Sequence, residues 1–144
     1  MVRKMPLISG GGIPQTRGAI NGRIQYKHPF IEMMAKFAGG ILSFSTGLSL
    51  GREGPSVQIG SYVGSLVSRW AHILQGERKQ LLAAGAGAGL AAAFSAPLAS
   101  SLIVIESIER FDAPKTAITT LLAGVVASAV ASMVFTVNPY HLIE

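Results

Sequence analysis

Long stretches without charge alternate along this chain with short breaks rich in glycine and proline. Four stretches approach or exceed the roughly 20 residues that a helix needs to cross a lipid bilayer. They cover residues 30–50, 56–74, 80–105 and 116–137, and charges fall mostly at their ends. The pattern predicts an all-α membrane protein, multi-pass and integral to the membrane, with broken and tilted transmembrane helices.

The most informative break is formed by Gly51, Arg52, Glu53, Gly54 and Pro55. Its two glycines release the backbone from ordinary steric limits, and Pro55 suits the first position of a helix. We therefore expect a helix that begins at about Ser56 and directs its free N–H groups back at Glu53. An external anion would be favoured at the same place.

A second break repeats this order near the start of the chain, with Gly10, Gly11, Gly12, Ile13 and Pro14. It predicts a short helix over residues 14–20. Broken helices whose N-termini point inward at membrane depth are how transporters build anion sites. The two breaks together therefore predict a pair of helix ends around one anion path.

Small residues recur at helical spacing, which predicts close packing between helices in the membrane. They lie at Gly39, Gly40, Ser43 and Gly47, at Gly60 and Gly64, throughout residues 83–93, and from Gly124 to Ser132. Pro97 should divide residues 80–105 into two helices, over 80–93 and 96–108, with Ser95 capping the second. Glu32 and Lys36 are four residues apart and are interpreted as a structural pair on one helix.

Composition supports a membrane protein and excludes several other classes. Hydrophobic residues make up 49% and charged residues 13%, about half the roughly 25% of a soluble domain. The net charge of +5 comes from scattered basic residues, which fits interfacial anchoring rather than nucleic-acid binding. No cysteine is present, the three histidines are dispersed, and no catalytic set is arranged by a motif. We expect no metal, no cofactor and no enzyme activity.

Three blocks in order resemble the CLC family of chloride channels and chloride/proton antiporters. They are residues 10–14, residues 51–60, and residues 85–99 with Pro97. The resemblance runs from about residue 5 to 137 and covers most of the first half of the CLC transmembrane domain. It implies an all-helical protein of two inverted halves, a homodimer with one pore per subunit, and a place in the cell (inner) membrane. The second half has no counterpart in residues 1–144.

The resemblance also implies roles for particular residues. Residues 10–14 and 51–55 would form the anion filter, and the Glu53 carboxylate would act as a gate that competes with the anion. The alternative for Glu53 is a capping carboxylate. Gly11 stands where the family has a serine, and Ser107 stands where antiporters have an inner proton glutamate. Glu106 could supply that proton path, or could be a solvated helix end.

These residues predict transmembrane transport of chloride or a similar small anion, either as a passive channel or as an exchanger weakly coupled to protons. A fluoride/proton antiporter of the same superfamily is one alternative, because Gly11 removes the serine hydroxyl. A non-transporting, truncated membrane fragment is another, because the second half is missing.

Overall fold

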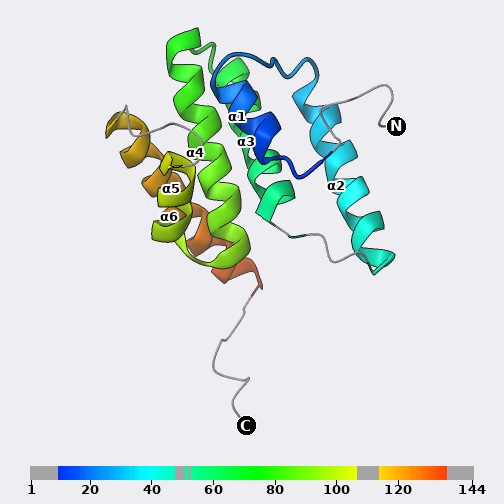
Figure 1. Cartoon of the computed structure of the whole chain (residues 1–144). Coiled ribbons are helices and arrows are strands. Elements are labelled where there is room, and N and C mark those ends of the chain that lie inside the picture. Colours follow the sequence, from blue (N-terminus) through cyan, green and yellow to red (C-terminus); the bar gives the residue numbers. More distant parts are fainter. Residues whose placement is uncertain (1–9, 48–50, 52, 107–113, 136–144) are drawn as a thin grey trace.

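The computed structural model describes residues 10–47, 51, 53–106 and 114–135, and every regular element in those ranges is helical. The prediction of an all-α fold is thus confirmed. In these ranges the described residues form six α-helices in succession, and Figure 1 shows how they are arranged. They are α1 (Ile13–Ile20), α2 (Pro29–Ser45), α3 (Glu53–Trp70), α4 (Gln75–Phe94), α5 (Pro97–Val104) and α6 (Pro114–Phe135).

Helix α4 lies at the centre of the arrangement. It packs against α3 on one side and against α5 and α6 on the other (Figure 1). The short helix α1 contacts both α3 and α4, and α2 packs along the outer side of α3. The small helix α1 is thereby held against the pair α3–α4, which forms the frame of the molecule.

The contact between α3 and α4 is made by backbone against backbone. A Cβ atom added to Gly60 would overlap the carbonyl oxygen of Gly85, and one added to Gly64 would overlap that of Leu81. A Cβ on Gly89 would meet the carbonyl oxygen of Ser56 in the same way. The close packing predicted for these glycines is therefore confirmed, as is typical of membrane helices.

The small residues of α2 behave differently. Beyond the neighbouring backbone of α2 itself, no atom of the described residues lies within 4 Å of a Cβ built on Gly39 or Gly40. The outward side of the helix exposes large apolar side chains, namely Phe30, Ile31, Met34, Phe37, Ile41 and Leu42. The predicted close packing of Gly39 and Gly40 is thus not made within the described part of the chain.

Polar side chains share the interior of this fold with apolar ones, while many large apolar side chains lie on its surface. Thr16, Gln58, Ser61, Ser65 and Thr120 are all fully buried. Large apolar side chains are exposed on the outer helices, including Leu98, Leu102, Leu122, Val126 and Met133. One described helix, over Pro114–Val134, has the length and the mean hydropathy, 2.0, for a membrane crossing. Large apolar side chains on the surface, with polar side chains in the interior, suit a lipid environment better than water.

Three helix boundaries differ from those expected. Helix α3 begins at Glu53, so Pro55 is its third residue, which still needs no N–H partner in the first turn. Helix α4 begins at Gln75, so the polar segment 75–79 is its first turn and not a loop. Ser95, with φ of 52°, closes α4 in a left-handed conformation, and Ala96 precedes α5. The prediction that Ser95 caps the second helix is wrong.

Candidate anion site

The two glycine-proline segments meet in the fold. A Cβ on Gly54 would overlap the carbonyl oxygen of Gly11. A Cβ on Gly12 would lie 2.5 Å from the carbonyl oxygen of Gly54 and 2.9 Å from Oε1 of Gln58. The segment that leads into α1 is thus in backbone contact with the first turn of α3, an approach that only glycine at these positions permits.

Helix α1 starts at this contact. Gly12 precedes it with φ of 90°, a conformation that a side chain would strain, and Pro14 occupies its first turn. Thr16 is fully buried and donates its backbone N–H and its hydroxyl to the Gly12 carbonyl oxygen, at 3.0 Å and 2.9 Å. The predicted helix over 14–20 is confirmed, and its N-terminus is fixed beside α3.

Glu53 is the first residue of α3, and its side chain is exposed. The carboxylate therefore belongs to the first turn, where the partial positive charge of a helix stabilises an anion. Gly54 behind it is buried and Pro55 is half-buried. Gly10, Gly11 and Gly51 are exposed, while Arg52 lies outside the described residues. The structure thus brings together the ends of α1 and α3 next to one exposed carboxylate.

Lys36 joins this site from α2. It is only 6% exposed, and its Nζ donates a hydrogen bond of 2.8 Å to the carbonyl oxygen of Gly10. Glu32, also 6% exposed, accepts from the backbone N–H of His28 at 3.3 Å. Lys36 thus connects α2 to the first glycine segment and carries a positive charge to the edge of the site. The interpretation of Glu32 and Lys36 as a pair within one helix missed this connection.

A buried polar cluster supports the contact from behind. Gln58, one turn along α3, lies against Gly12 and donates through Nε2 to the Tyr62 hydroxyl at 2.9 Å. The rings of Tyr62 and Tyr26 pack at a centroid distance of 4.4 Å, and the Tyr26 hydroxyl lies 3.4 Å from Oγ of Ser61. Nothing in the spacing of these residues marked them as neighbours of the site.

The inner proton path falls largely outside what the structure describes. Glu106 is exposed and follows the C-terminal end of α5. Ser107 lies beyond the described residues. The predicted role of Glu106 therefore stays a prediction.

The fold is that of a helical membrane protein in which the N-terminal ends of α1 and α3 lie together. The sequence profile of the voltage-gated chloride channel family matches residues 1–144, and the chain belongs to that family. It is 38% identical over 138 residues to the H⁺/Cl⁻ exchange transporter ClcA of Citrobacter koseri, covering 94% of this chain. It is 43% identical over 107 residues to ClcA of Vibrio cholerae, covering 74% of this chain.

A solved structure supports the same assignment. A slow cyanobacterial Cl⁻/H⁺ antiporter is similar with a TM-score of 0.75 and 37% identity, over 90% of this chain. The chain spans 29% and 23% of the two ClcA relatives and 31% of the antiporter chain. It therefore corresponds to less than a third of these proteins, and the relatives named are transporters.

Proposed function

We propose that this chain forms the first-half anion site of a CLC transporter that moves chloride or a similar small anion. The observation that supports this most directly is the contact of Gly11 and Gly12 with Gly54, which sets the N-termini of α1 and α3 side by side. Helix N-termini present free N–H groups and partial positive charge, so together they favour an anion between them.

Glu53 is the gate in this proposal. Its carboxylate belongs to the first turn of α3 and would occupy the place that a transported anion would take. A negative side chain and a free anion compete for the same N–H groups, and protonation of the carboxylate removes that competition. The anion then enters when Glu53 is neutral, which links transport to pH.

The names of the relatives favour proton-coupled exchange over the passive alternative, since they are H⁺/Cl⁻ exchangers. In this proposal a second proton carrier lies on the other side of the anion site. Glu106, exposed at the end of α5, is the carboxylate of the described residues that we assign to this role. A homodimeric assembly belongs to the same proposal.

The test uses the complete protein that contains this chain, reconstituted in liposomes. Glu53→Gln should retain chloride flux but lose its pH dependence and any accompanying proton movement. Glu77→Gln, an exposed carboxylate in the first turn of α4, is the matched control and should behave as wild type. Unchanged pH dependence in Glu53→Gln would refute the gate. Proton movement that survives Glu106→Gln would refute the second assignment alone.

The fluoride alternative rests on Gly11. Nothing of the described chain lies within 4 Å of a Cβ on Gly11, so a serine would fit there and its absence has no steric cause. Fluoride export would appear as growth in fluoride that depends on the gene, with little chloride flux in the same liposomes.

A further inference from the structure

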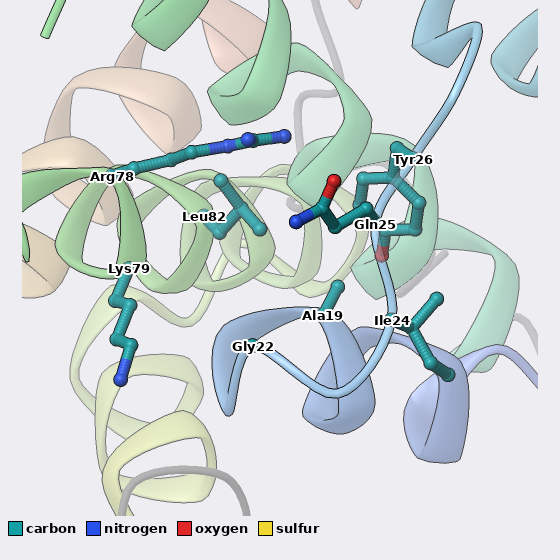
Figure 2. Close-up of a pocket in the computed structure, with 8 residues that line it drawn as sticks. All are labelled: Ala19, Gly22, Ile24, Gln25, Tyr26, Arg78, Lys79 and Leu82. Carbon is teal, nitrogen blue, oxygen red and sulfur yellow. The ribbon is translucent and has the colours of Figure 1, made fainter. Parts of the chain in front are cut away.

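A small cavity lies near the end of α3 that is remote from Glu53. It has a volume of about 100 Å³, is partly open, and is lined by the end of α1, the segment after it, and the first turns of α4. Arg78, Lys79 and Gln25 line it, together with Tyr26 and Gly22. In Figure 2, Arg78 extends toward Gln25 and Tyr26, while the side chain of Lys79 extends away from both.

The lining of this cavity is positively charged. Two of its eight residues are cations and none is a carboxylate. Arg78 is held in place because it donates to Oγ of Ser65 at 3.2 Å, and a guanidinium has five N–H donors. Further donors therefore remain for a ligand. The planar fork of arginine matches the oxygens of a phosphate group, and a neighbouring lysine adds a point charge.

The cavity lies at the level where lipid headgroups are expected. Arg69, at the end of α3, donates to the backbone carbonyl oxygens of Tyr26 and Lys27, so this end of α3 adjoins the cavity wall. The next residue, Trp70, is 86% exposed, and Leu74 is 78% exposed. An exposed tryptophan beside basic residues is typical of a helix end at the membrane interface.

We propose that this cavity binds the phosphate group of an anionic phospholipid, with the acyl chains remaining outside it. Basic pockets between membrane helices recognise such headgroups. The volume admits a phosphate group, and exposed Leu74 offers apolar surface at the same end of the fold. The site is separate from the anion path, so it does not depend on the transport function proposed above.

The experiment measures lipid retention by native mass spectrometry of the complete, detergent-solubilised protein. Phosphatidylglycerol and phosphatidylcholine with the same acyl chains are added separately, and inorganic phosphate is the third probe. Phosphatidylglycerol should be retained most strongly. Lys79→Gln and Arg78→Gln should each weaken it by roughly fivefold, the effect of one interfacial cation. Lys115→Gln, an exposed cation at the start of α6, should not.

A second variant adds a charge without removing a contact that Arg78 makes. Gln25→Glu keeps the shape of an exposed side chain and places a carboxylate in the cavity wall. It should weaken phosphatidylglycerol binding while the melting temperature in detergent stays unchanged. Equal retention of the two lipids, or equal effects of Lys79→Gln and Lys115→Gln, would overturn the proposal. Binding of inorganic phosphate as strong as that of phosphatidylglycerol would overturn the assignment to a lipid.

Discussion

Gly54 at the start of α3 lies against the carbonyl oxygen of Gly11, so closely that no side chain fits between the two segments. Residues far apart in the sequence thereby become neighbours at the candidate anion site. The contact is made by backbone alone, so its geometry does not depend on the rotamer of any side chain. Glycine at position 54 is thus a condition for this contact, on which the proposed anion site depends.

Gly54→Ala should therefore separate α1 from α3. Forcing a methyl group into a packed contact typically costs about 1–3 kcal/mol, and the new Cβ would overlap the Gly11 carbonyl. We expect a lower melting temperature in detergent and loss of chloride flux. Gly39→Ala is the control, because open space surrounds its Cβ in the described structure. Equal stability and flux in both variants would mean that the contact is not needed.

Gly11→Ser should fold normally and bind chloride more tightly. The position is exposed and has room for a side chain, and the hydroxyl adds a donor beside the anion path. One hydrogen bond contributes about 0.5–1.5 kcal/mol, and the upper value corresponds to roughly tenfold in affinity. Titration calorimetry with chloride measures this directly.

Gly12→Ser supplies the contrast for that experiment. A Cβ there would lie 2.5 Å from the Gly54 carbonyl oxygen, on a backbone with φ of 90°. It should lower the melting temperature and abolish binding. An unchanged chloride affinity in a folded Gly11→Ser protein would separate Gly11 from the anion site.

Much of the fold follows from where glycine and proline stand. Each releases or restricts the backbone locally, so Pro14, Pro55 and Pro97 mark helix starts correctly to within a few residues. The contact of α3 with α4 was also predictable, because Gly60 and Gly64 remove side chains from one face of a helix. These effects depend on residues that are close together in the sequence, so they can be predicted from it.

Other features depend on partners that spacing does not reveal. Ser95 resembles a helix cap by its place before Pro97, but the chain needs a left-handed residue there to end α4. The segment 75–79 resembles a loop because it is polar. In the structure it forms the first turn of α4, ahead of the apolar part of that helix. The bond from Lys36 to Gly10 crosses between two elements, so helical spacing within α2 could not disclose it. A lysine inside an apolar stretch was the available signal.

Lys36→Met should weaken chloride binding and loosen the first glycine segment. It removes a buried positive charge and the hydrogen bond to Gly10, and hydrogen bonds to charged groups contribute about 1.5–3 kcal/mol. We expect the apparent chloride affinity in liposome flux to fall by roughly tenfold, equivalent to about 1.4 kcal/mol.

Two further variants isolate the charge of Lys36. Lys36→Arg should retain part of the wild-type affinity, because it keeps the charge. Lys115→Met removes an exposed cation at the start of α6 and should leave chloride affinity unchanged. If Lys36→Met and Lys115→Met gave the same affinity, Lys36 would have only a structural role.

Gly60→Ala should destabilise the helical frame, while Gly124→Ala should not. A Cβ on Gly60 would overlap the Gly85 carbonyl oxygen, whereas one on Gly124 would meet the Ala91 side chain at 3.4 Å, an ordinary contact. The first change forces α3 from α4 and should cost about 1–3 kcal/mol. The second should be neutral or slightly stabilising, since alanine restricts the unfolded chain and favours helix. The melting temperatures of both variants, measured in the same detergent, test this prediction. A Gly60→Ala protein as stable as Gly124→Ala would show that the packing of α3 on α4 does not rely on this contact.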